Sequence, residues 1–175
     1  MSTQVIDILG GSGLGKSTTA AGLFYYMKLK GINCEQVTEF VKKLAWEGKR
    51  ITPLDQLYTM GQQTQSEALL YGKVDYIVTD SPILLSAMYD SFYNKRTAIV
   101  DTVLDFIKVS EIKHHYYLLE RHKEFDPRGR FETAAQAKEI DGFIKEKMVQ
   151  WEIPYTLLTC KDEDRVATIM KDLSL

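Results

Sequence analysis

The chain carries near its start the stretch Gly10-Gly11-Ser12-Gly13-Leu14-Gly15-Lys16-Ser17, followed by Thr18. This stretch decides the fold, because it fits the phosphate-binding pattern GxxxxGK[ST] in full. An apolar run over residues 5–9 predicts a buried strand before it, and apolar residues at helical spacing predict a helix over residues 16–29. The motif therefore lies where its chemistry requires, between a strand and a helix.

Each residue type in this loop has a physical reason. Glycines let the backbone wrap closely round phosphate oxygens, and the N–H groups at the start of the helix favour negative charge. Lys16 places a mobile positive charge at the β and γ phosphates, and Ser17 offers a hydroxyl to magnesium. A chance glycine turn would give this pattern in under about one per cent of chains of this length. We therefore predict that residues 10–18 bind ATP and Mg²⁺.

Strand patterns and helix patterns alternate along the rest of the chain. The further predicted strands are 34–37, 76–80, 116–119 and 155–158, and the predicted helices include 84–93 and 97–109. Such alternation requires right-handed crossovers and a mainly parallel sheet covered on both faces. We predict an α/β three-layer sandwich whose ligands bind outside the carboxyl ends of the strands.

Length and composition indicate a single globular domain over residues 1–175, with 45% hydrophobic and 26% charged residues. The net charge of −2 argues against a surface that neutralises many phosphates of a long nucleic acid, but it allows a local basic cleft. No leader-like start and no run of about eighteen apolar residues occurs, so we expect a cytoplasmic protein without a membrane partner. Cys34 and Cys160 form no CxxC pair and are expected to be reduced.

Asp80 ends an apolar strand, which places its carboxylate at the sheet edge where the phosphate loop also lies. This is the position of a Walker B acid, which holds magnesium directly or through water. Asp80 and Ser17 are therefore the predicted metal ligands. The alternative is that Asp80 caps the helix that follows Ser81-Pro82.

Glu39 follows the second predicted strand and is expected to face the same cleft. A carboxylate there could accept the proton of an attacking hydroxyl or hold a ribose hydroxyl of the substrate. Equally, Glu39 could be a first-turn acid that the helix dipole favours. Both interpretations stay open at this stage.

The polar segment 120–133 contains Arg121, Arg128 and Arg130, with Gly129 between the last two. Arginine forks can neutralise charge that develops on a phosphoryl group in transfer, and a closing segment can exclude water. We therefore predict a lid here, with Arg128 and Arg130 as catalytic candidates beside Lys16, Glu39 and Asp80. The alternative is a solvated loop whose arginines pair with its own acids.

Other chemistry-bearing side chains are interpreted as structural. His114 and His115 are adjacent and are placed before a strand with their side chains on opposite faces, so they do not form a predicted metal site. Asp7, in the first strand, is expected to pack within the sheet. Tyr89, Phe92 and Tyr93 could stack a base, although aromatic residues on one helix are more often core.

Four elements together resemble a known group, the small AAA-type P-loop kinases, many of which are phage-encoded. These elements are the phosphate loop, Thr38-Glu39-Phe40, the strand end Asp80-Ser81-Pro82, and Asp126-Pro127-Arg128-Gly129-Arg130-Phe131-Glu132-Thr133. The group is related to ribosylnicotinamide kinase domains and, more loosely, to deoxynucleoside and thymidylate kinases. The resemblance implies a P-loop kinase-like fold, ATP with magnesium, a carboxylate near the acceptor hydroxyl and a lid with arginines.

The sequence departs from the thymidylate kinase pattern at one telling position. An Asp-Arg dipeptide ends the third strand in that pattern, whereas Asp80-Ser81 stands here. The arginine that would grip the phosphate of a monophosphate acceptor is missing, so we expect an unphosphorylated hydroxyl.

One phage branch of the group phosphorylates 5-hydroxymethyluracil within DNA. Lys42, Lys43, Lys49 and Arg50 form a basic cluster that could follow a DNA backbone, or that could equally be the solvated face of a helix. The sequence thus predicts an ATP-dependent kinase for a nucleoside-type hydroxyl, free or in DNA. The alternative function is a P-loop ATPase switch without a small-molecule acceptor.

Overall fold

The computed structural model describes residues 2–48, 53–122, 124–128 and 132–175. Its strands are β1 (Gln4–Leu9), β2 (Cys34–Val37), β3 (Tyr76–Thr79), β4 (Lys113–Leu119) and β5 (Thr156–Leu158). Its helices are α1 (Lys16–Leu29), α2 (Val41–Trp46), α3 (Pro53–Ala68), α4 (Ile83–Asn94), α5 (Ala98–Val109), α6 (Ala134–Gln150) and α7 (Arg165–Asp172), with a 3-10 turn η1 (Asp162–Asp164) before α7.

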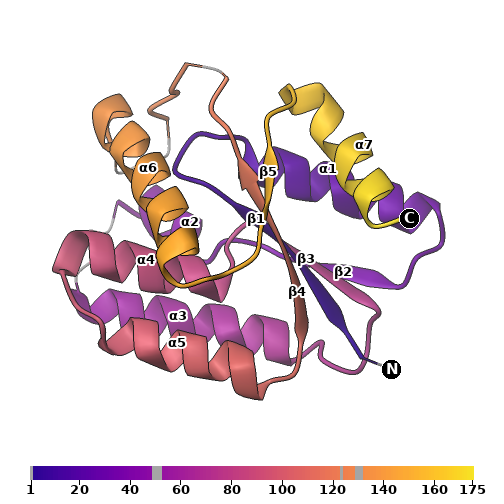
Figure 1. The fold of residues 1–175 in the computed structure, drawn as a ribbon, viewed down its shortest axis with the longest axis horizontal. Coiled ribbons are helices and arrows are strands. Elements are labelled where there is room, and N and C mark those ends of the chain that lie inside the picture. Colours follow the sequence, from indigo (N-terminus) through magenta and orange to yellow (C-terminus); the bar gives the residue numbers. More distant parts are fainter. Residues whose placement is uncertain (1, 49–52, 123, 129–131) are drawn as a thin grey trace.

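The described strands form one sheet in the order β2-β3-β1-β4-β5, and every neighbouring pair is parallel. Helices α1 and α7 cover one face of the sheet, and α3, α4, α5 and α6 lie over the other (Figure 1). The predicted α/β three-layer sandwich with a parallel sheet is therefore confirmed. None of the helices within the described ranges is long and apolar enough to cross a bilayer.

The core follows the alternation of side chains along the strands. Ile6 and Ile8 of β1 point to the face covered by α1 and α7, where they pack with Leu23 and Met27. Leu9 points to the opposite face and joins the apolar cluster formed with α4, α5 and α6. Because each such side chain contributes about 1.5–3 kcal/mol when buried, the two clusters fix β1 at the centre of the molecule.

Strand register places the candidate site residues side by side. Asp7 of β1 lies opposite Thr79 of β3, so the two strands end at the same edge of the sheet. The phosphate loop leaves β1 at that edge, and Asp80 leaves β3 beside it. This is the carboxyl edge, where ligands bind in open parallel sheets.

The prediction that His114 and His115 precede the fourth strand is wrong, because β4 begins at Lys113. His114 and His115 are both polar and do not extend the apolar run that predicted this strand, so the predicted strand began only at Tyr116. Their side chains do lie on opposite faces: His114 contacts Asp7, and His115 contacts Gln4. The sequence Thr52-Pro53 also predicts the cap and first turn of a helix; Pro53 is the first residue of α3, and Thr52 lies outside the described residues.

Candidate active site

The phosphate loop links β1 to α1 in a conformation that its sequence favours. Gly13 and Gly15 have φ values of 80° and 87°, in the left-handed region that other residues rarely adopt. Gly15 is also the N-cap residue of α1, so the loop runs directly into the first turn of that helix. Lys16 Nζ donates to the carbonyl oxygen of Gly11 at 2.9 Å, which folds the lysine back over the loop.

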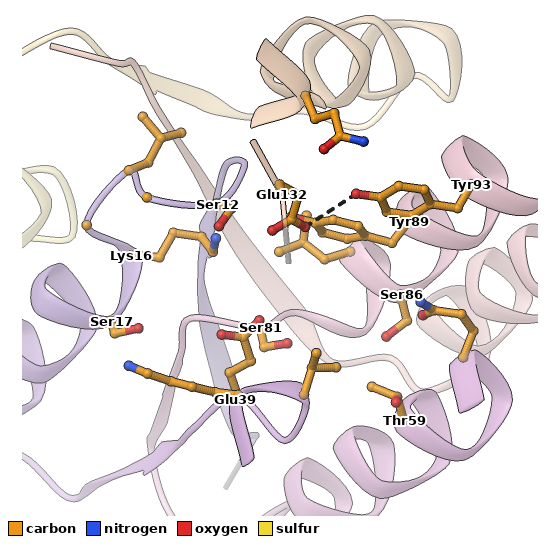
Figure 2. A pocket seen from close by; sticks show the side chains of 18 of the residues that line it. Ser12, Lys16, Ser17, Glu39, Thr59, Ser81, Ser86, Tyr89, Tyr93 and Glu132 are labelled. Atoms are coloured by element: carbon orange, nitrogen blue, oxygen red, sulfur yellow. Dashed lines mark hydrogen bonds between the residues drawn. The ribbon is translucent and has the colours of Figure 1, made fainter. Parts of the chain in front are cut away.

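A cavity of about 540 Å³ opens in front of the loop. Residues 12–18 line one side of it. The opposite side comes from α3 and α4, through Gln56, Thr59, Ser86, Tyr89 and Tyr93. Figure 2 shows Lys16 and Ser17 on the loop side, Thr59, Ser86 and the two tyrosines across from them, and Glu39 and Ser81 between. One cavity therefore joins the phosphate loop to a second, mixed polar and aromatic compartment.

Asp80 follows the last residue of β3 and is not itself among the residues that line the cavity, although the next residue, Ser81, is. Its side chain is buried, and within the described part of the chain its Oδ1 has no hydrogen-bond partner. The N-cap residue of α4 is Pro82, and no side chain caps that helix. The alternative in which Asp80 caps the helix is therefore not what the structure shows.

Glu39 stands just before α2 and lines the cavity. Burial raises the pKa of the Glu39 carboxyl, the nearby charges of Asp80 and Glu132 raise it further, and Lys16 and Lys42 partly oppose the increase. The carboxyl precedes the first turn of α2 and faces the cavity, so the first-turn role at the helix is not what the structure shows. A carboxylate with a raised pKa beside the phosphate loop is a stronger base than an ordinary glutamate.

The predicted lid segment is described only in part. Arg128 reaches the cavity, but its side chain is largely exposed and pairs with Asp126 at 2.7 Å, as the solvated-loop alternative anticipated. Arg130, the other catalytic candidate here, lies outside the described residues, as does Gly129. Arg121 contacts the loop backbone at Ser12.

The three aromatic residues of α4 divide between cavity and core. Tyr89 and Tyr93 line the cavity with their rings stacked at a centroid distance of 6.1 Å. The Tyr93 hydroxyl donates to Glu132 at 3.4 Å, which links α4 to the residue before Thr133, the N-cap of α6 (Figure 2). Phe92 packs edge-on against Phe143 of α6 and belongs to the core.

Comparison with known proteins agrees with this geometry. The pattern that defines the AAA domain family matches residues 5–165, which span the phosphate loop and all of the cavity. The chain belongs to the AAA domain family. None of the curated proteins matches it in sequence.

Solved structures show how this AAA domain is folded. Deoxyadenosine kinase from M. mycoides with the products dCMP and a flexible dCDP bound superposes with a TM-score of 0.65 at 17% identity, over 98% of this chain and 99% of that one. The same kinase with bound dATP gives a TM-score of 0.59 at 18% identity, over 98% and 100% of the two chains. At these identities the likeness establishes the fold.

Sequence reasoning missed the polar end of the cavity in this AAA domain. Gln56 and Thr59 lie three residues apart on α3, and Ser86 lies across from them on α4. All three are buried, and within the described chain Thr59 Oγ1 has no partner. Their spacing was the only available signal, and polar residues at that spacing usually form the solvated face of a helix.

Proposed function

We propose that the protein is an ATP-dependent kinase that transfers the γ-phosphate to a hydroxyl of a nucleoside-type acceptor. The observation that carries the proposal is the single cavity that joins the phosphate loop to the compartment between α3 and α4. A nucleotide on the loop and an acceptor in that compartment would meet beside Glu39. The shared fold with deoxyadenosine kinase, which was solved with nucleotides bound, supports this assignment.

The chemistry follows from where the charges lie. Lys16 would hold the β and γ phosphates and stabilise the charge that develops on transfer. Glu39 would accept the proton of the attacking hydroxyl, since burial raises its pKa and makes it a stronger base than an exposed glutamate. The oxygen of the acceptor then bonds to the γ phosphorus as the bond to the ADP oxygen breaks. Arg128 and Arg130 are proposed to neutralise the phosphoryl oxygens when the segment 120–133 closes as a lid.

The residues present fit a magnesium ion. Asp80 provides a buried oxygen without a partner among the described residues, and Ser17 provides a hydroxyl on the cavity wall. Hard oxygen donors of this kind are the ligands that Mg²⁺ prefers. When bound there, the ion would supply neutralisation of phosphate charge.

The acceptor compartment suits a flat, polar group without a phosphate. Tyr89 offers an aromatic face, and Gln56 offers an amide that can both donate and accept a hydrogen bond, which is the pattern a base edge requires. Ser81 lines the cavity where an arginine would grip a phosphate. We therefore place an unphosphorylated nucleoside ahead of a monophosphate.

An acceptor within DNA is the finer version of the proposal, with 5-hydroxymethyluracil in phage DNA as the candidate. Lys42 and Lys43 are exposed on α2, and Lys42 lines the cavity, so a phosphate backbone could approach there. Lys49 and Arg50 of the same basic cluster lie outside the described residues. Under this version the protein acts in the cytoplasm of the infected host.

Transfer to a panel of acceptors tests the proposal. The protein is incubated with γ-labelled ATP, Mg²⁺ and free nucleosides, nucleoside monophosphates or hydroxymethyluracil DNA. Label on a free nucleoside supports the first version. Label only on DNA, with an affinity that falls steeply as salt rises, supports the second, because phosphate contacts release counterions. Release of phosphate without any labelled acceptor would support the ATPase switch instead.

A further inference from the structure

The backbone of the phosphate loop is tied to a helix that is distant in sequence. Asp141 of α6 accepts a hydrogen bond from the Gly11 N–H through Oδ1 at 3.0 Å. Its second oxygen, Oδ2, accepts from Arg121 Nε at 2.6 Å. Arg121 in turn donates to the Ser12 carbonyl oxygen at 2.8 Å. Both oxygens of one carboxylate thus hold two successive residues of the loop, one directly and one through an arginine.

The ion pair between Asp141 and Arg121 is more buried than an ordinary surface ion pair. The side chains of Asp141 and Arg121 are 21% and 19% exposed, so solvent screens the pair only partly. A Cβ at position 11 would overlap Asp141 Oδ1, so the carboxylate can approach only because residue 11 is glycine. The arginine is geometrically suited to this role, since its fork donates in two directions at once.

A second arginine holds the other half of the loop. Arg165, at the start of α7, is only 1% exposed and donates from Nη1 to the Leu14 carbonyl oxygen at 2.7 Å. Its Nη2 donates to the carbonyl oxygen of Glu120, the residue before Arg121, at 2.9 Å. The loop is therefore held at Ser12 by Arg121 and at Leu14 by Arg165.

Fixing these two carbonyls also fixes two N–H groups. In a trans peptide the C=O of one residue and the N–H of the next point in opposite directions. With the Ser12 and Leu14 carbonyls directed at the arginines, the N–H groups of Gly13 and Gly15 point away from them. Gly13 and Gly15 both line the cavity, where a phosphate would accept from such donors.

We propose that Asp141 is a positioning residue for nucleotide binding. It orients Arg121 and anchors Gly11, and the two contacts together set the peptide plane between Ser12 and Gly13. The role is a new one for α6, which lines the cavity through Gln136 near its N-terminal end; Asp141 does not line the cavity and acts through the loop. The inference rests on the proposed function in one respect, that the loop receives the phosphates of ATP.

The substitution Asp141→Asn tests the role with little change in shape. An asparagine can still accept from Gly11, but it loses the charge, and turning its NH₂ toward Arg121 would set donor against donor. We expect a Kd for a non-hydrolysable ATP analogue with Mg²⁺ that is about 10- to 100-fold weaker by titration calorimetry, as for a misplaced binding group. Glu146→Gln, an exposed acid on the same helix, is the matched control and should leave the Kd unchanged.

Two further measurements separate this inference from the proposed function. Arg121→Lys keeps the charge but cannot span Asp141 and Ser12, so its Kd should weaken in the same direction. Hydrogen exchange of the loop amides without nucleotide should quicken in Asp141→Asn, whether or not the protein proves to be a kinase. Unchanged exchange, or an unchanged Kd in both variants with only a lower Tm, would overturn the positioning role. If the wild-type protein does not bind ATP, the proposed function is overturned, and with it the nucleotide part of this inference.

Discussion

His114 Nδ1 lies 2.8 Å from Asp7 Oδ2 at the centre of the sheet, and both side chains are almost fully buried. Glu67 of α3 is buried close by, and Tyr71 and Gln63 lie near enough to its carboxyl to oppose part of the increase in its pKa. Burial is the main cause that raises the pKa of Glu67, and the charge of Asp7 adds to it. Burial disfavours the ionised form of Glu67, whereas the charge of Asp7 favours the protonated form of His114, so this cluster makes the stability of the fold depend on pH.

Glu67→Gln should remove one part of that dependence. The folded protein holds the Glu67 proton more tightly than the unfolded chain does. The free energy of unfolding therefore falls as pH rises from the unfolded pKa, about 4.3, toward the higher folded value. Glutamine stays neutral. The free energy of unfolding of the variant, relative to that of wild type, should therefore increase by about 1–3 kcal/mol between pH 4 and pH 8. Urea unfolding across this pH range measures the increase, with Glu146→Gln as the control. If the free energies of unfolding of Glu67→Gln and wild type differ by the same amount at every pH, the pKa of Glu67 is not raised in the folded protein.

The two neighbouring histidines should act with opposite signs. Burial lowers the pKa of His114, but the charge and hydrogen bond of Asp7 outweigh it and raise the value. The stabilisation that His114 gives the fold is present below its pKa in the unfolded chain, about 6.5. It is lost as pH rises through its pKa in the folded protein. Burial and Lys113 lower the pKa of His115, so its contribution is lost as pH falls.

Substitution by glutamine separates the two histidines. His114→Gln should destabilise by about 3–5 kcal/mol at low pH, because it leaves Asp7 buried without its ionic partner, and by less above neutral pH. His115→Gln should show the reverse trend and a smaller effect. Urea unfolding at pH 5, 7 and 9 shows how the destabilisation in each variant changes with pH. If it changes in the same direction in both variants, Asp7 does not raise the pKa of His114.

Glu39→Gln should reduce kcat by about 10²- to 10⁴-fold, the usual contribution of a general base. The KM for ATP should change little, because in the proposed function the loop, and not Glu39, binds the phosphates. The wild-type kcat should rise with pH through the pKa of Glu39, which lies above the ordinary glutamate value. Glu35→Gln, on the preceding strand and exposed, is the control. A pH profile that keeps its acid limb in Glu39→Gln would assign that limb to another group.

Asp80→Asn should weaken magnesium-dependent turnover by about 10²-fold or more, because it would remove the charge of a proposed metal ligand. Titration of kcat with Mg²⁺ should need a higher concentration for half-saturation than in wild type. Asp75→Asn, at the opposite end of β3, provides the matched control. If Asp80→Asn and wild type share one magnesium dependence, Asp80 has a purely structural role.

Local sequence patterns were sufficient to predict the layers of this fold. The phosphate loop could be placed because glycines at fixed spacing, a lysine and a hydroxyl occur between an apolar run and a helical repeat. Glu39 and Asp80 were predicted beside it because parallel strands end at one edge of the sheet. Glu39 does line the cavity, whereas Asp80 is buried next to Ser81, which lines the cavity in its place.

What the sequence did not reveal depends on contacts between distant residues. Asp141 lies 130 positions from Gly11, and nothing in the pattern of α6 marks it as different from the other acids of that helix. The start of β4 was missed because His114 and His115 are polar residues that the sheet buries by pairing with Asp7 and Gln4. Such pairs exist only once strands from different parts of the chain are neighbours.

Transfer of the γ-phosphate by wild type and by Lys16→Ala tests the central claim most directly. Lys16 contacts the loop carbonyl of Gly11 and faces the cavity, so its removal should leave the fold intact, with an unchanged far-UV spectrum. The measurement is mass spectrometry of a nucleoside acceptor after incubation with γ-labelled ATP and Mg²⁺. A labelled nucleoside phosphate should form with wild type, and none should form with the folded Lys16→Ala variant. Equal labelling by the two proteins, or no labelled acceptor with wild type, would contradict it.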